Sequence, residues 1–332
     1  MANQKAEFAN LICRFGDKAV MLDYFNEIVG PAFFGKSRAF TRRHGKAFYF
    51  FHNVQLLTLD DEDGTPSRVL AGRIVRKTTL ESQQVFVAGH LRATRQSLET
   101  APSSFFLLVL QSHRLVFVRE MHGAPNPDQF ALLLEHNARM MWQKLVRFDD
   151  YWLNSNLSGP LTLKERERVV PKPSVDVVPF ASDDSIDEQV HRFSLLRELD
   201  IVFRGTNHEL NNSEFFGQWH DTFEELDASE ASLKFKSPEG LQKDRAKEEV
   251  KLASTGGTQR IRLRGLDLQG HKLAVDDSDF TLVRELDKKL GRQVPAAARK
   301  LYRGFLKVVR EGFISAGATD AATMKKVEGI DS

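Results

Sequence analysis

The chain of 332 residues has very little cysteine, which excludes several classes of protein. Its single cysteine, Cys13, permits neither a disulfide within the chain nor a multi-cysteine zinc site. Cys13 lies in the apolar stretch "FANLICRFG", so we expect a buried and unreactive thiol. The first residues, "MANQKAEFAN", lack the charged start and apolar run of an export signal. These features predict a cytoplasmic protein in a reducing compartment.

Long apolar runs and common catalytic motifs are also missing. The longest apolar run, "FFLLVL" at 105–110, is far shorter than the ~20 residues that cross a membrane, so we expect no membrane segment. The sequence contains no phosphate loop, no dinucleotide-binding glycine pattern and no serine-hydrolase elbow. The histidines show no tight metal-ligand spacing. We therefore expect no resident metal or cofactor and favour a binding protein over an enzyme.

The first half of the chain predicts helix, then strands, then helix. Apolar residues at 8–29 recur at helical spacing, and "GP" at 30–31 ends that segment. Strand-like stretches follow at 47–59, 68–80 and 83–89, and "SSFFLLVLQSHRLVFV" at 103–118 predicts a hairpin. A strong amphipathic helix then spans 126–148, with Asn126 or Asp128 near its start.

The second half follows a polar segment with three prolines, residues 154–174, which we predict to be a linker. Its alternation of strands and helices predicts an elaborated ferredoxin-like, or split βαβ, unit. A basic amphipathic helix near 296–314 comes last. We thus predict an α+β protein of mainly antiparallel sheets with packed helices. The predicted parts are an N-terminal domain at 1–153, the linker, a C-terminal domain at 175–316 and a disordered tail at 317–332.

Positive charge is concentrated in one stretch of the first half. In "FFGKSRAFTRRHGKAFYFF", residues 33–51, the side chains of lysine, arginine and histidine are mixed with aromatic rings. No acidic residue lies between Glu27 and Asp60. Clustered cations are what a phosphate backbone requires, because each neutralised phosphate releases counterions. Aromatic rings can stack on unpaired bases. The alternative is a solvated basic loop that leads into a core strand.

Two other strands add candidate cations. "RVLAGRIVRKTTL" contributes arginines and a lysine near the basic stretch, and "RIRLRG" places three arginines on one strand face. The three-arginine face fits an edge strand protected from aggregation equally well. The predicted phosphate contacts are Lys36, Arg38, Arg42, Arg43, Lys46, Arg73, Lys77, Arg260, Arg262 and Arg264, and the predicted stacking rings are Phe34 and Phe40.

Two alternatives stay open beside nucleic-acid binding. A metal-dependent nuclease would use Asp221 with Glu249 and Lys251 of a Glu-x-Lys motif, and would require Mg²⁺ or Mn²⁺. That motif functions on a strand, whereas "QKDRAKEEVKLAS" has helical composition. A protein-interaction scaffold would dock a partner on the apolar stripe of the 296–314 helix.

We predict a nucleic-acid-binding protein whose ligand is DNA or RNA. The expected role is a non-catalytic subunit or adaptor of a bacterial complex that acts on foreign nucleic acid, in the manner of antiviral defence. A protein partner or a second copy of the chain is expected to accompany it. This role is inferred from the overall character of the sequence and not from a motif.

Overall fold

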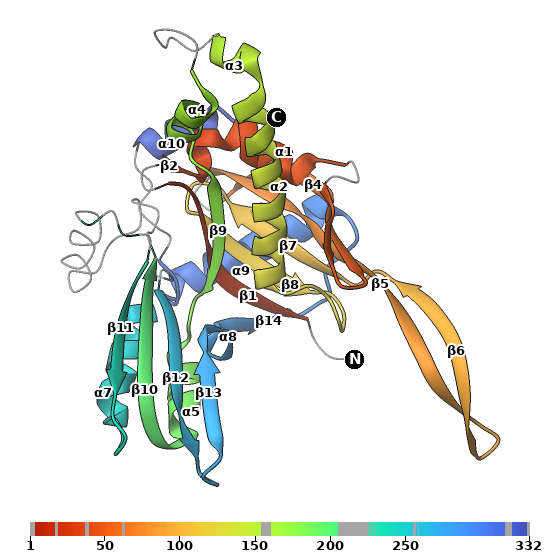
Figure 1. Cartoon of the computed structure of the whole chain (residues 1–332), viewed down its shortest axis with the longest axis vertical. Helices are drawn as coiled ribbons and strands as arrows, with labels where there is room; N and C mark the ends of the chain where they lie inside the picture. Colours follow the sequence, from red (N-terminus) through yellow and green to blue (C-terminus); the bar gives the residue numbers. More distant parts are fainter. Residues whose placement is uncertain are drawn as a thin grey trace.

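The computed structural model combines helices with two antiparallel sheets, which confirms the predicted α+β class (Figure 1). It describes residues 4–16, 19–36, 40–61, 64–153, 161–204, 226, 228, 230–254, 257, 259–315 and 321–330. Among these residues, no helix has the length and apolar character needed to cross a bilayer.

The larger sheet has ten strands, and its main path runs β14-β1-β8-β7-β5-β4-β3. Strands β9 and β14 pair with β1 on the edge away from β8, and the short β2 pairs with the end of β1 on the same edge as β8. The strands are β1 (Lys5–Phe15), β2 (Ala19–Val20), β3 (Arg42–His44), β4 (Ala47–Asp60), β5 (Pro66–Val87), β6 (His90–Thr100), β7 (Ser103–Val109), β8 (Arg114–Arg119), β9 (Pro173–Pro179) and β14 (Val283–Glu285).

Helices cover the large sheet on both faces. Helix α2 (Pro127–Arg147) lies on one face, together with α1 (Gly30–Phe34) and the short helical turns at 21–29. Helix α9 (Val294–Arg310) covers the other face (Figure 1). Strand β1 therefore buries side chains on both sides: Leu11 and Cys13 point toward α2, and Ala6 and Phe8 toward α9.

A cluster of phenylalanine rings forms the core between α2 and the sheet. The Phe130 ring of α2 lies 5.0 Å from the Phe106 ring and 5.4 Å from the Phe51 ring, measured between centroids. Phe33 of α1 and Phe117 of β8 complete the cluster. These rings bury a large apolar area without requiring hydrogen-bond partners, as the high phenylalanine content predicts.

Strands β5 and β6 continue beyond the sheet as a two-stranded ribbon. Residues 78–87 of β5 pair with residues 90–100 of β6, and Figure 1 shows this ribbon extending away from the rest of the molecule. Its base is tied to the body by the ion pairs Lys46–Glu81 and Lys77–Glu99.

The smaller sheet has four strands in the order β11-β10-β12-β13. One of its faces packs against helices α5 and α7 in a separate apolar core. The elements are α5 (Asp183–His191), β10 (Phe193–Arg204), β11 (Glu230–Lys236), α7 (Lys243–Ser254), β12 (Gln259–Asp267), β13 (Lys272–Asp276) and α8 (Asp277–Phe280).

The ferredoxin-like arrangement predicted within the second half is not the one that these strands adopt. The strand expected to open that unit is β9, and it pairs with β1 of the large sheet. The pairings of the four small-sheet strands are all antiparallel, whereas a split βαβ unit contains a parallel pair. Strand β14 and helix α9 also join the large sheet, so contacts cross the predicted domain boundaries at 153 and 175. The boundaries themselves stay a prediction.

Residues 8–15 form part of strand β1, so the predicted helical segment at 8–29 is wrong in its first third. Because β1 is buried on both faces, it reads as a continuous apolar run, and periodicity alone does not distinguish such a run from a buried helix. Within the predicted linker, residues of α4 (Leu163–Val169) and the start of β9 are ordered. A short helix, α3 (Asp149–Leu153), precedes the predicted linker.

The expected disordered tail is wrong for residues 321–330. They form α10 (Ala321–Glu328) and the turn after it, and the side chains of Val327 and Ile330 are buried in the α2-side core. Lys326 Nζ lies 2.8 Å from Asp23 Oδ1, and Arg68 Nη2 donates to the Ile330 carbonyl oxygen at 2.8 Å. Little in the sequence indicates that Val327 and Ile330 are buried, because small residues precede α10.

The phenylalanine cluster yields a stability test. Phe130→Ala is expected to lower the free energy of unfolding by about 3–5 kcal/mol, because it leaves a cavity among four rings. Leu132→Ala is the matched control, since Leu132 lies on the same helix and is 46% exposed; we expect a change within about 0.5 kcal/mol. Urea unfolding of both variants measures the difference, and equal losses would contradict the assigned core.

Candidate nucleic-acid interface

The predicted basic stretch crosses from α1 into the hairpin formed by β3 and β4. Lys36 follows α1 and is exposed, Arg42 and Arg43 lie in β3, and Lys46 lies in the turn between the strands. Arg38 lies outside the described residues. Gly45 has φ +60° in this tight turn, a conformation that glycine adopts without strain.

Arg42 faces the helix α2. It is the cross-strand partner of Tyr49, whose hydroxyl accepts a hydrogen bond from Gln129 Nε2 of α2 at 3.0 Å. Partners across an antiparallel pair point to the same side, so Arg42 lies on the α2 side of the sheet. The pKa of His136 on α2 is lowered by its burial and by the nearby Arg42 guanidinium.

The C-terminal half of α2 extends this positive surface. The Lys144 ammonium lies 5.4 Å from the centre of the Phe40 ring. Arg147 is exposed one helical turn beyond Lys144, and Phe34 at the end of α1 is 38% exposed. Helix α1 is held against α2 by a hydrogen bond from Asn137 Nδ2 to the Ala32 carbonyl oxygen at 3.0 Å.

We call this region the basic α2 surface and define it by its cations and rings. Its members are Lys36, Arg42, His136, Lys144, Arg147, Phe34 and Phe40. Within the part of the chain that the structure describes, no ion pair joins Lys36, Arg42, Lys144 or Arg147 to a carboxylate. Arg43 is excluded because its guanidinium lies over the Phe48 ring, on the opposite face of the β3–β4 hairpin.

The predicted cations near the ribbon have acidic partners. Lys46 Nζ lies 2.8 Å from Glu81 Oε1, and Lys77 Nζ lies 3.2 Å from Glu99 Oε2. Both pairs are exposed, so each contributes little stability and leaves its lysine accessible. Arg73 differs, because its half-buried guanidinium is bonded to Glu120 at 2.9 Å and to two backbone carbonyl oxygens at 291 and 292. Arg73 is therefore held within the fold, and its assignment as a phosphate contact stays a prediction.

Carboxylates lie beside the three arginines of β12. Arg264 Nη1 lies 3.0 Å from Glu198 Oε1 on the neighbouring strand. Arg262 is exposed between its cross-strand partners Asp200 and Asp276. These interactions place negative charge beside every arginine of this face, so it lacks the uniform positive potential that the sequence suggested.

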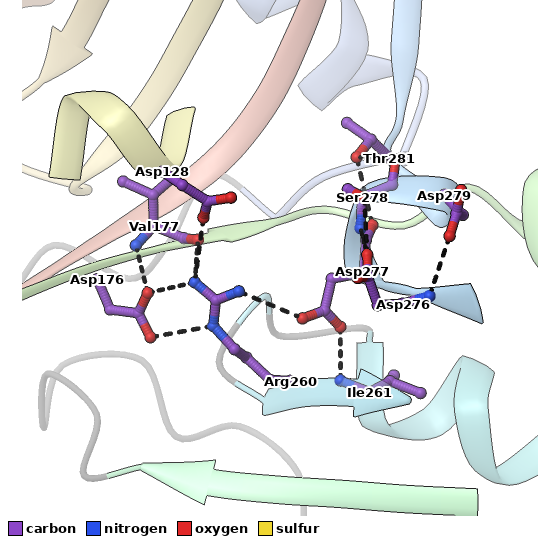
Figure 2. A network of polar contacts seen from close by, with 10 residues as sticks. All are labelled: Asp128, Asp176, Val177, Arg260, Ile261, Asp276, Asp277, Ser278, Asp279 and Thr281. Carbon is purple, nitrogen blue, oxygen red and sulfur yellow. Dashed lines mark hydrogen bonds and ion pairs between the residues drawn. The ribbon is translucent and has the colours of Figure 1, made fainter. Parts of the chain in front are cut away.

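Arg260 forms a network between the two sheets (Figure 2). Its guanidinium bonds both carboxylate oxygens of Asp176 on β9, and it lies 3.5 Å from Asp128 of α2 and 3.7 Å from Asp277 of α8. Burial opposes the charge of Arg260, but the bonds to Asp176 outweigh it and raise the arginine's pKa. A cavity of about 520 Å³ borders this network and is also lined by Arg119 and Arg262. Arg260 thus links the small sheet to the large one.

Asp277 is the most perturbed carboxylate of this network. Its Oδ1 atom accepts a hydrogen bond from the Ile261 backbone N–H at 2.5 Å, and its side chain is buried. Burial raises the pKa of Asp277 to about 7, although the Ile261 amide and Arg260 partly offset this effect. A carboxyl that exchanges its proton near neutral pH can serve as an acid or base, but its partners here are the protein's own groups.

The nuclease alternative has no support in the geometry. Glu249 and Lys251 lie on helix α7, two residues apart, so their side chains point to different sides instead of along a strand face. Lys251 Nζ is engaged by Asp187 at 3.1 Å and Asp183 at 3.4 Å. Asp221 lies outside the described residues. Among the residues that are described, no group of three or more His, Cys, Asp or Glu side chains is placed to hold a metal ion.

Cys13 is buried in β1, as the sequence predicted. Burial, and to a smaller extent the charge of Glu135, raise the pKa of its thiol to about 12. The thiol therefore stays protonated at neutral pH, and nucleophilic chemistry at Cys13 is disfavoured.

Sequence reasoning missed Lys144, Arg147 and the Arg260 network. Lys144 and Arg147 could have been found from the sequence, because the amphipathic pattern of α2 places both on its polar side. The network had none, because Asp128, Asp176 and Asp277 come from three separate elements.

Comparison with known proteins adds no identity. No protein-family model matches the chain, and no curated protein is detectably similar to it in sequence. The function is therefore argued from the side chains themselves.

The raised pKa of Asp277 predicts a specific pH dependence of stability. The folded protein holds this proton up to about pH 7, whereas the unfolded chain releases it near the ordinary value of 3.8. The folded state thus binds more protons between these values, and stability falls as pH rises through this window. The separation corresponds to at most about 4 kcal/mol.

Asp277→Asn keeps an oxygen acceptor for Ile261 but cannot ionise, so we expect it to remove this decline. Urea unfolding at pH 5 and pH 8 would measure the decline in the native protein and in the variant. Asp279→Asn is the matched control, because it changes an adjacent carboxylate and leaves Asp277 in place. An identical pH dependence in all three proteins would contradict the assignment.

Proposed function

We propose that this protein binds nucleic acid through the basic α2 surface. The supporting observation is a contrast in charge pairing. Arg73, Lys77, Arg260 and Arg264 each have a carboxylate partner, whereas no ion pair within the described part of the chain reaches Arg42, Lys144 or Arg147. Glu27 lines the same hollow as Lys144 and Arg147, so the cations of this surface outnumber its acids. A polyanion relieves the repulsion among such cations while releasing its own counterions.

The rings of the basic α2 surface favour a single strand over a duplex. Phe34 presents a partly exposed ring, and Phe40 lies beside Lys144, so a base stacked there would sit next to a cation. Stacking needs unpaired bases, contributes about 1–3 kcal/mol per base and tolerates any sequence. The ligand class is therefore single-stranded DNA or RNA, held by its backbone and by its base faces.

The wider role stays part of the proposal. We retain the expectation of a non-catalytic subunit or adaptor, in a bacterial complex that acts on foreign nucleic acid, with a protein partner or a second copy of the chain. Its support is the character of the sequence, including the absence of readable catalytic motifs. The expected cytoplasmic location has the same basis.

The test is fluorescence anisotropy with labelled 20-nucleotide single strands at several salt concentrations. The variant Arg42→Ala/Lys144→Ala/Arg147→Ala is expected to bind roughly ten- to a hundredfold more weakly and to reduce the salt slope by about 2–3. The matched control is Lys236→Ala/Arg245→Ala/Arg264→Ala, which removes the same charge from exposed residues that have acidic partners. We expect this control to retain nearly native binding.

Equal losses in the two triple variants would mean that only net charge matters and would contradict a site at the basic α2 surface. Unchanged binding in the first variant would contradict it as well. Thermal unfolding of both variants checks that each remains folded.

A further inference from the structure

Helix α9 is the most basic element of the chain. Its 17 residues include Arg299, Lys300, Arg303, Lys307 and Arg310 and no acidic residue. Its apolar side, with Leu301, Phe305 and Val308, is buried against the face of the large sheet opposite α2. The apolar stripe therefore covers the protein's own sheet, the second of the two interpretations that the sequence allows, and a protein-interaction role for the rest of the helix stays a prediction.

A groove runs between α9 and the segment that contains the end of β14. Its volume is about 1040 Å³, and it is lined by Arg284 on one side and by Arg299, Arg303 and Lys307 on the other. The three helix residues recur every four positions, so they form one row with steps of about 6 Å. Among the described residues, no ion pair reaches Arg299 or Arg303, and Lys307 has only the exposed Glu311 at 3.8 Å.

An aromatic ring also lines the groove. Phe313 is 49% exposed, and the Arg284 guanidinium lies over it, 4.2 Å from the ring centre. A row of cations beside a half-exposed ring is the combination that binds single-stranded nucleic acid: the cations hold phosphates and the ring stacks on a base.

Acidic residues in the groove reduce its positive charge without cancelling it. Five cations line it, since Lys300 joins the four named above, against the three acids Glu285, Asp287 and Glu311. The difference, five minus three, leaves the groove at +2. A membrane surface is disfavoured as the ligand, because a membrane-bound helix inserts its apolar side, and that side of α9 is covered.

The geometry points to a second single-strand nucleic-acid site in the α9 groove, on the face of the large sheet opposite the basic α2 surface. One chain would then hold two strands, or two segments of one strand, on opposite sides. This inference shares its ligand class with the proposed function and uses none of its residues, so each can fail alone.

The experiment is a calorimetric titration with a 10-nucleotide oligothymidine, a probe chosen to be short so that two molecules can bind separately. The native protein is expected to bind two per chain. Arg299→Ala/Arg303→Ala/Lys307→Ala and Arg42→Ala/Lys144→Ala/Arg147→Ala are each expected to bind one, and the combined variant none. Replacing the three α9 residues by Lys, Lys and Arg keeps the charge and is expected to restore the second site.

One oligonucleotide per native chain, with the α9 variant unaffected, would overturn the inference and leave the proposed function standing. If the native chain binds one oligonucleotide and only the α9 variant loses that binding, the result would support the groove site and contradict the basic α2 surface. Phe313→Ala separates base stacking from charge: weakening of the groove site by about five- to a hundredfold is expected. Unchanged binding in Phe313→Ala, or equal competition by inorganic polyphosphate, would overturn the single-strand assignment. So would an α9 variant that loses binding to phosphatidylserine vesicles but still binds the oligonucleotide.

Discussion

Burial of both faces of the large sheet is the constraint on which the rest of the molecule depends. Strand β1 lies inside this sheet and contributes apolar side chains to the α2 core and to the α9 core. Covering both faces buries most of the apolar side chains of α2 and α9, so mainly polar side chains of these helices meet solvent. Recognition of a partner must then rely chiefly on charge and on the few rings that remain exposed, Phe34 and Phe313 among them.

Charge pairing divides the cations into two groups with different roles. Arg73 and Arg260 are half-buried, are bonded by carboxylates and join separate parts of the chain. Burying an arginine without such partners would be costly, so these ion pairs are conditions of the fold. The cations of the basic α2 surface and of the α9 groove are exposed or half-buried, and such groups contribute little to stability. We propose that their arrangement serves a ligand.

The sequence predicted elements whose signal is local and missed those whose meaning depends on distant residues. The β7–β8 hairpin, α2 with its Asn126 cap and α9 followed from period and capping chemistry. Strand β1 was misread because burial on both faces removes the alternation that marks a strand. The basic stretch at 33–51 contains only some of the residues of the basic α2 surface, because Lys144 and Arg147 lie about a hundred residues further along the chain. The ion pair of Arg260 could not be predicted, because its partner Asp176 lies 84 positions away.

We propose that cations without acidic partners hold the nucleic acid, whereas paired cations stabilise the fold. Ultraviolet crosslinking of the native protein to a uniformly labelled single strand, followed by peptide mapping, tests it most directly, since aromatic side chains crosslink efficiently to stacked bases. The account predicts crosslinked peptides that contain Phe34 or Phe40 and Phe313. Crosslinks concentrated on β12, around Arg260 to Arg264, would contradict it.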